Sequence, residues 1–337
     1  MQKLVVLAGV LWALIAATPA WPGSQQGQVD LQFDLSAQPA GEEVKLWIPY
    51  PVSDKDQLIT DIKYSGDYAT SAVYTEGEHG NPMLFVQWGK DAKSRKLTFS
   101  FHAKRQEVSR KAFPAKETCW DPADYQSYLK ATKLGPIDGE VKKLADTITK
   151  GQNTVQGKAK AIYDWVCQNM YRDPDTRGCG TGDVCALLKK PGGKCTDISS
   201  VYIALARAVG VPAREIFGLR LGKKPEEDIT QYQHCWAEFY LPGYGWVPVD
   251  PADVRKAMLV EKLKPEDPKT KTYEEYFWGG IDQYRIKLAD GRDLILNPPQ
   301  SGEPLNTFGY PFAQVGTRTI DWLEPATFKY QFTWKAQ

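Results

Sequence analysis

The stretch "GGKCTDISSVYIALARAVGVPAR", residues Gly192–Arg214, decides the fold because a single cysteine stands where an apolar helix begins. The apolar positions recur at helical spacing and lie at Ile198, Val201, Tyr202, Leu205 and Val209. Gly210 and Pro212 end the predicted helix. A helix start offers free N–H groups and the positive end of the helix dipole, and both favour a thiolate. Cys195 is therefore a candidate nucleophile.

A cysteine nucleophile needs a base, and the base needs an orienting group. The chain has three histidines, His79, His102 and His234. His234 begins the predicted strand "HCWAEFYL", and Asp250 ends the next predicted strand, "GWVPVD". Adjacent antiparallel strands bring the start of one beside the end of the next. We therefore expect His234 and Asp250 to be neighbours, with Asp253 as a weaker alternative acid.

The rest of the chain predicts an α+β protein. Alternating apolar residues in stretches such as "VDLQFDL" and "KLTFSFHA" predict an antiparallel β domain, with the character of a sandwich, at residues 25–112. Helical patterns and then strands predict an α+β catalytic core at residues 120–262. The tail, residues 275–337, contains further β patterns, which we expect to pack on the core.

The N-terminal segment has the pattern of a secretory signal peptide. Lys3 precedes an apolar run from Leu4 to Ala17, and small residues follow up to Ala20, where cleavage is expected. The run is short for a membrane span, so an uncleaved anchor is the less favoured alternative. We expect residues 1–20 to be removed and the mature protein to be periplasmic or secreted, without stable insertion in a membrane.

Charge and motifs exclude some classes of partner. The chain of 337 residues has a net charge of +1, which does not indicate a nucleic-acid partner. The glycine-rich stretch "RGCGTGDVC" matches neither a P-loop nor a dinucleotide-binding fingerprint. We therefore expect no cofactor.

Other roles for Cys195 stay open at this point. It could be a buried thiol, half of a disulfide or a metal ligand. The six cysteines are Cys119, Cys167, Cys179, Cys185, Cys195 and Cys235. In an oxidising compartment they can pair, although the sequence does not give their connectivity. Their spacing includes no CxxC pair, which argues against zinc, and we expect no metal. On a strand, the side chain of Cys235 would face away from His234 and would pack or form a disulfide.

Two motifs together, "GGKCTDISSVYIALARAVGVPAR" and "HCWAEFYLPGYGWVPVDPADV", resemble the transglutaminase-like superfamily. The flanking "RGCGTGDV" is similar to bacterial exported members. The resemblance implies a papain-like core and acyl transfer through a thiol, with Cys195 as nucleophile, His234 as base and Asp250 as orienting acid. It covers roughly residues 140–260.

The resemblance leaves the substrate and the second oxyanion donor open. Gln168, Asn169 and Tyr171 are weak candidates for that donor. No EF-hand loop is visible, so hydrolysis by a peptidase or amidase is favoured over transfer to an amine. Export suggests peptides, proteins or cell-envelope polymers as substrates. The alternative is an inactive binding or scaffold module, which the filled Cys, His and Asp positions disfavour.

Overall fold

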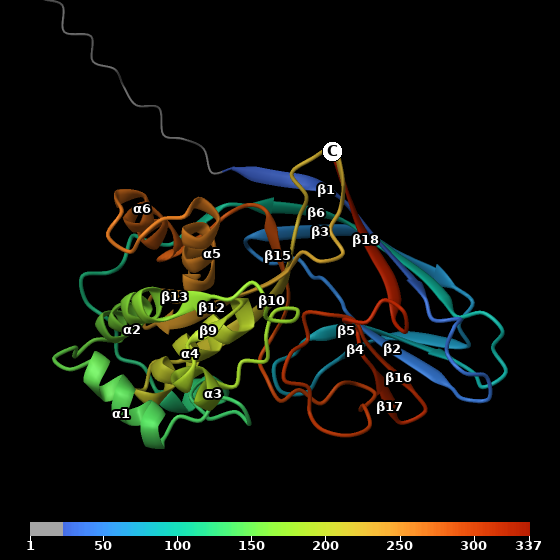
Figure 1. The fold of residues 1–337 in the computed structure, drawn as a ribbon, viewed down its shortest axis with the longest axis horizontal. Coiled ribbons are helices and arrows are strands. Elements are labelled where there is room, and N and C mark those ends of the chain that lie inside the picture. Colours follow the sequence, from blue (N-terminus) through green and yellow to red (C-terminus); the bar gives the residue numbers. More distant parts are fainter. Residues whose placement is uncertain (1–22) are drawn as a thin grey trace, which may run out of the picture.

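The computed structural model describes residues 23–337 and shows a mixed α and β architecture. A helical layer packs on a four-stranded sheet at one end of the molecule, and two five-stranded sheets form the other end (Figure 1). The predicted signal peptide lies outside the described residues. No helix within residues 23–337 has the length and apolar character needed to cross a membrane.

The first five-stranded sheet is antiparallel and alternates buried and exposed residues along its central strand. Its strands, in spatial order, are β11 (Glu226–Asp228), β18 (Lys329–Ala336), β1 (Ser24–Asp34), β6 (Lys96–Gln106) and β3 (Gln57–Gly66). Val29, Leu31 and Phe33 point inward from β1, as the period of two predicts. This sheet therefore supplies one wall of a sandwich.

The second five-stranded sheet supplies the opposite wall. Its strands, in spatial order, are β17 (Arg318–Ile320), β16 (Phe312–Val315), β2 (Val44–Pro49), β5 (Pro82–Trp88) and β4 (Thr70–Thr75). Trp88 from this sheet and Phe99 and Trp334 from the first sheet belong to one buried cluster. The two inner faces thus share a single apolar core.

The strands of the tail are divided between the core sheet and the sandwich. β15 (Arg285–Asp290) does join the core sheet by pairing with β10. β16, however, pairs with β2, and β18 pairs with β1 from Gly27↔Ala336 to Asp34↔Lys329. Without them β1 and β2 would be edge strands with unpaired backbone groups. Because the sandwich uses both ends of the chain, the three-segment division of the mature protein stays a prediction.

The core is organised around α4 (Cys195–Ala208), in which every residue is buried. A helix that is apolar on most sides requires neighbours all round. α4 packs on the sheet β13-β12-β10-β15 and against other helices. The remaining core strands are β10 (Ala213–Arg220), β12 (Gln233–Leu241) and β13 (Gly245–Val249). The helices around α4 are α1 (Gly139–Ile148), α2 (Val155–Asn169), α3 (Val184–Lys189) and α5 (Pro251–Glu261).

Short elements complete the fold. They are the 3-10 helix η1 (Pro122–Tyr128), α6 (Pro268–Phe277), and two two-stranded sheets, β7 (Val108–Ser109) with β14 (Gly280–Ile281) and β8 (Tyr171–Arg172) with β9 (Gly192–Gly193). The β8–β9 pair is parallel and leads directly into α4. It therefore fixes the position of the residue that begins this helix.

Candidate active site

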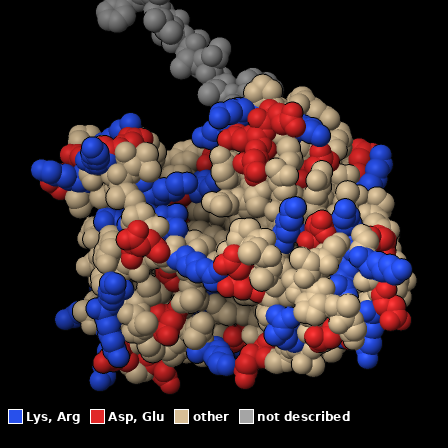
Figure 2. All heavy atoms as spheres, turned by 45° about the vertical axis from the view of Figure 1, so that its right-hand side comes forward, with Lys and Arg blue, Asp and Glu red and all other residues tan. Residues whose placement is uncertain are grey.

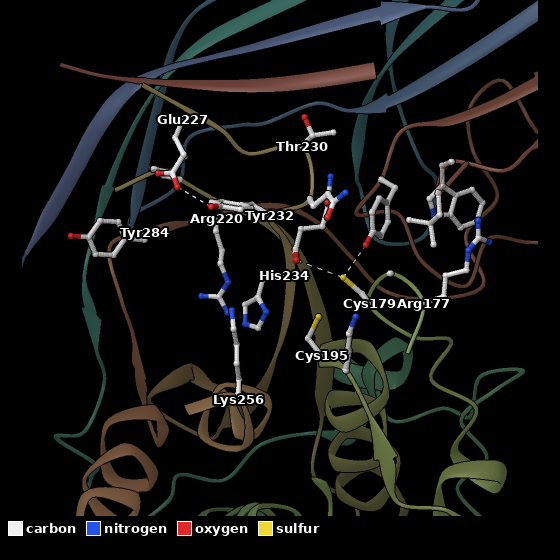
Figure 3. Close-up of a pocket in the computed structure, with 18 of the residues that line it drawn as sticks. Arg177, Cys179, Cys195, Arg220, Glu227, Thr230, Tyr232, His234, Lys256 and Tyr284 are labelled. Atoms are coloured by element: carbon white, nitrogen blue, oxygen red, sulfur yellow. Dashed lines mark hydrogen bonds between the residues drawn. The ribbon is translucent and has the colours of Figure 1, made fainter. Parts of the chain in front are cut away.

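A cleft of about 770 Å³ contains Cys195 and His234 in its lining. Its walls come from the core and from the sandwich, which contributes Phe328 and Tyr330 next to and within β18. Figure 2 shows one face of the molecule hollowed near its centre, with Lys and Arg side chains around the hollow. The side chains of Cys195 and His234 point into the same space in the close-up (Figure 3).

The start of α4 is held by a dense set of backbone contacts. One oxygen of the Asp197 carboxylate accepts the N–H of Lys194 at 3.0 Å, and the other accepts the N–H of Gly182 at 2.8 Å. The N–H of Thr196 donates to the carbonyl of Cys179 at 2.9 Å. A Cβ at Gly193 would lie 2.4 Å from the Asp197 side chain, so only glycine fits there. These contacts tie the preceding loop to the helix start and fix the position of the Cys195 sulfur.

Three sulfur atoms gather at this point. The Sγ atoms of Cys179, Cys195 and Cys235 lie within 4.8 Å of one another and are buried. Cys179 Sγ also hydrogen-bonds with the Tyr310 hydroxyl at 3.1 Å, and Cys235 Sγ with the Thr196 hydroxyl at 3.3 Å. The sequence pattern left Cys235 without a role. The structure places its sulfur beside Cys195 rather than in a disulfide.

The cluster favours the thiolate form of one cysteine over the other two. Hydrogen bonding from the thiols of Cys179 and Cys235, together with the neighbouring His234, outweighs burial and holds the pKa of Cys195 well below its usual value. Burial and the nearby thiols raise the pKa of Cys235 well above that value. The pKa of Cys179 is also raised, chiefly by hydrogen bonding with Cys195. Cys195 is therefore the nucleophile that this environment supports.

His234 and Asp250 meet where the sequence predicts. β12 and β13 are antiparallel neighbours, and His234 Nε2 lies 2.7 Å from Asp250 Oδ2 in the buried interior. The other carboxylate oxygen of Asp250 accepts the N–H of Asp253 at 2.9 Å and thereby caps α5. One carboxylate thus starts a helix and orients an imidazole, and this leaves His234 Nδ1 as the nitrogen free for proton transfer.

The other sequence candidates lie elsewhere. His102 is on β6 in the sandwich, and His79 packs near Tyr128 and Asp290. Gln168, Asn169 and Tyr171, the candidate oxyanion donors, are not among the residues that line the cleft. Asn169 instead donates to the Trp165 carbonyl at 2.8 Å. Within residues 23–337, no hydrogen bond joins Cys195 Sγ directly to His234, as is common in the absence of substrate.

Two arginines that the motif did not reveal hold the acids. The buried guanidinium of Arg285 contacts Asp250, Asp253 at 2.9 Å and Asp282 at 2.6 Å. Arg220 donates to both oxygens of Asp253 at 2.6 and 2.7 Å. Two carboxylates buried at one helix start are costly without cations. The two neighbouring acids in the sequence therefore predict a cationic partner, but they do not identify which arginines supply it.

The charges around His234 favour its protonated form. Burial and Arg220 lower the pKa of His234, but Asp253 and Asp250 outweigh them, so that the pKa is raised above its usual value. A raised imidazole pKa and a lowered thiol pKa together favour a thiolate–imidazolium pair. Such a pair is ready to attack a carbonyl carbon without prior proton transfer.

Among residues 23–337, two groups of side chains lie close enough to hold a metal ion. The first is formed by His234, Asp250 and Asp253, whose carboxylates are already engaged by Arg220 and Arg285. The two guanidinium groups would repel a cation there. The second is the sulfur cluster, whose ligands suit a soft ion such as Zn²⁺ or Cu⁺. Such an ion would bind Cys195 Sγ, the atom of the candidate nucleophile.

We expect Arg285→Met to reduce stability by about 3–5 kcal/mol, because it leaves buried carboxylates without their cation. The matched control is Arg177→Met, which breaks an exposed pair with Asp321 and should reduce stability far less. Urea unfolding of both variants measures the difference. Equal losses in the two variants would show that the Arg285 network is not important for folding.

The comparisons with known proteins agree with this geometry. Residues 142–251, which include Cys195, His234 and Asp250, match the family model of the transglutaminase-like superfamily. An uncharacterized protein of Haemophilus influenzae is 37% identical over 318 residues, covering 87% of this chain and 86% of that protein. The uncharacterized protein YebA of Bacillus subtilis is 28% identical over 125 residues, covering 33% of this chain and 17% of that protein.

A solved structure matches nearly the whole chain. It is that of a candidate cysteine protease from Cytophaga hutchinsonii, which aligns with a TM-score of 0.53 at 16% identity over 93% of this chain and 98% of the other. At this identity the likeness concerns the fold. Together with the family model and the Haemophilus influenzae relative, it leads to one conclusion: the chain belongs to the transglutaminase-like superfamily.

Proposed function

We propose that this protein is an exported cysteine enzyme that breaks amide bonds of peptides or cell-envelope polymers through a Cys195–His234–Asp250 triad. The observation that carries the proposal is the buried His234–Asp250 hydrogen bond of 2.7 Å at the cleft that also contains Cys195. The export rests on the N-terminal sequence pattern alone. The superfamily membership supports acyl-transfer chemistry but does not choose the acceptor.

The first half of the proposed reaction forms a thioester. The Cys195 thiolate attacks the amide carbon, a C–S bond forms, and the carbonyl oxygen becomes an oxyanion. The N–H of Cys195, which has no acceptor within residues 23–337, is positioned by the helix start to stabilise that oxyanion. Protonated His234 then donates its proton to the amide nitrogen, the C–N bond breaks, and the amine leaves.

The second half regenerates the enzyme. Neutral His234 removes a proton from the acceptor, which then attacks the thioester carbon, and the C–S bond breaks. With water the product is a carboxylic acid, and with an amine it is a new amide. The Asp250 carboxylate stabilises the imidazolium formed in each half-reaction. We favour water because it reaches an open cleft at high concentration.

Whether water or an amine accepts the acyl group can be tested with peptide amides in the presence of a fluorescent primary amine under reducing conditions. Hydrolysis predicts a carboxylic acid as the main product, identified by mass spectrometry. Incorporation of the amine without acid would instead assign a transamidase. The absence of both products with every peptide in a diverse library would favour the binding-module alternative.

The pH dependence of kcat/KM should show a wide plateau. Activity rises as Cys195 ionises, which begins below the usual thiol pKa, and falls as His234 loses its proton above the usual imidazole pKa. Cys179→Ala removes a thiol donor, so its acidic limb should move to higher pH while its basic limb stays. Rates of iodoacetamide reaction across pH check this directly. An unchanged acidic limb in Cys179→Ala would contradict the role given to the sulfur cluster.

A further inference from the structure

The cleft is much more positively charged than the chain as a whole. Seven Lys and Arg side chains line it, against two carboxylates, Glu227 and Asp282. The net charge of the chain is only +1. Both carboxylates are already engaged, because Glu227 accepts the N–H of Lys223 at 2.8 Å and the Tyr232 hydroxyl at 2.8 Å, and Asp282 binds Arg285.

Five of the seven cations have no anionic partner among the described residues. Arg220 is paired with Asp253 and Arg177 with Asp321. The cations that form no ion pair within residues 23–337 are Arg172, Lys194, Lys223, Lys224 and Lys256. One guanidinium nitrogen of Arg172, Nη1, is buried and also lacks any hydrogen-bond partner in this part of the chain. A buried donor without a partner is costly and uncommon in folded proteins. The cleft therefore holds positive charge that the protein itself does not neutralise.

Three of these cations, Arg172, Lys194 and Lys256, come from separate elements that converge on the candidate nucleophile. Arg172 is on β8, in register with Gly193 of β9. Lys194 directly precedes Cys195. Lys256 extends from α5 into the cleft beside Arg220 and His234 (Figure 3). Helix, strand and loop thus place these like charges around one site.

The placement of these cations acts on the pKa of Lys256. Burial, followed by repulsion from Arg220, lowers its pKa, and Arg172 adds to this although Asp253 acts in the opposite direction. A bound anion would offset the repulsion between Lys256 and the two arginines. Guanidinium groups bind carboxylates through two parallel hydrogen bonds, and an ammonium adds a compact positive charge.

We propose that the cleft recognises acidic peptides, by seating a substrate carboxylate on Arg172, Lys194 and Lys256 next to the bond that Cys195 attacks. This inference rests on the proposed function for the identity of the attacked bond. The carboxylate can belong to an Asp or Glu side chain or to a peptide C-terminus, and the experiment separates these sources.

The test uses binding, so that it does not depend on turnover. Three fluorescent peptides of otherwise equal sequence are titrated onto the Cys195→Ala protein: one with an internal Glu and an amidated end, one with Gln and an amidated end, and one with Gln and a free C-terminal carboxylate. We expect at least one carboxylate peptide to bind about tenfold tighter than the neutral one, which is the scale of a charge-assisted hydrogen bond. Equal affinities of all three peptides would overturn the inference.

Variants test which side chains bind the substrate carboxylate. In the same Cys195→Ala background, Lys256→Gln should lose most of the preference for the carboxylate, and Lys256→Arg should keep it. Lys93→Gln, an exposed change on the sandwich outside the cleft, is the control and should keep it too. Thermal unfolding checks that each variant is folded. A preference that survives both Lys256→Gln and Arg172→Gln would place the carboxylate elsewhere and overturn the assignment.

The two proposals fail separately. If wild-type protein binds the acidic peptide with the expected preference but releases no product, the proposed enzymatic function fails and the carboxylate site stands. If acidic and neutral peptides are cleaved with equal kcat/KM and bound equally, the function stands and the carboxylate site fails.

Discussion

Cys195→Ala is expected to abolish acyl transfer, with a loss of about 10⁶-fold in kcat, while the protein stays folded. The sulfur is the attacking atom, and neither neighbouring thiol can replace it. Burial raises the pKa of Cys235 and is unchanged by the substitution, and Cys179 lies in a loop rather than at a helix start. The change removes one small buried atom from a helix start whose backbone contacts come from Asp197 and Thr196. Circular dichroism and urea unfolding should therefore remain close to wild type.

The matched control for this variant is Cys185→Ala. Cys185 is exposed on α3 and does not line the cleft, so its removal should leave turnover unchanged. Selective alkylation gives a second readout, since iodoacetamide at neutral pH should label Cys195 first. Turnover that persists in Cys195→Ala would contradict the proposed mechanism, whatever the state of the other cysteines.

The meeting of His234 and Asp250 could be predicted from the sequence because it depends on local order. Each residue stands at the end of one of two consecutive strands, and a short connection makes such strands antiparallel neighbours. The start of α4 could be predicted for a similar reason, since apolar spacing and Gly210 mark both ends of the helix. Features set by nearby residues are readable from a single sequence.

The partners of the tail strands could not be predicted, because long-range pairing is not encoded in composition. β18 pairs with β1 across some three hundred residues, and nothing in "FKYQFTW" distinguishes the edge of the sandwich from the edge of the core sheet. The same holds for Arg285, which reaches Asp250 only because β15 adds to the core sheet beside β10. A buried carboxylate demands a cation, but the topology decides which cation arrives.

The sulfur cluster was missed for a related reason. Alternation along a strand assigns Cys235 to a face of β12, but it does not say what covers that face. The covering elements are the start of α4 and the loop that carries Cys179, which is drawn in by the contact between Gly182 and Asp197. The role of a residue such as Cys235 therefore becomes visible only when its neighbours are placed.

Asp250→Asn is expected to lower kcat/KM by about 10⁴-fold without unfolding the protein. An asparagine oxygen can still accept the N–H of Asp253 and cap α5, so the helix start is retained. The lost charge is one of the two that raise the pKa of His234. The asparagine amide can also donate to Nε2, which would move the imidazole proton to the nitrogen that must accept protons during the reaction. The basic limb of the pH profile should therefore shift to lower pH as turnover falls.

Asp253→Asn separates orientation from charge. Asp253 Oδ1 lies 3.8 Å from His234 Nε2, farther than the 2.7 Å of Asp250 Oδ2, and both Asp253 oxygens already accept bonds from Arg220. Neutralising Asp253 should also lower the pKa of His234, but it leaves the hydrogen bond that orients the ring. We therefore expect this variant to shift the basic limb and to lose about tenfold or less in kcat/KM at the plateau, the scale of a charge acting without a direct bond. If Asp253→Asn proves more damaging than Asp250→Asn, the orienting acid of the triad is Asp253, because the residue that holds the tautomer must carry the larger loss.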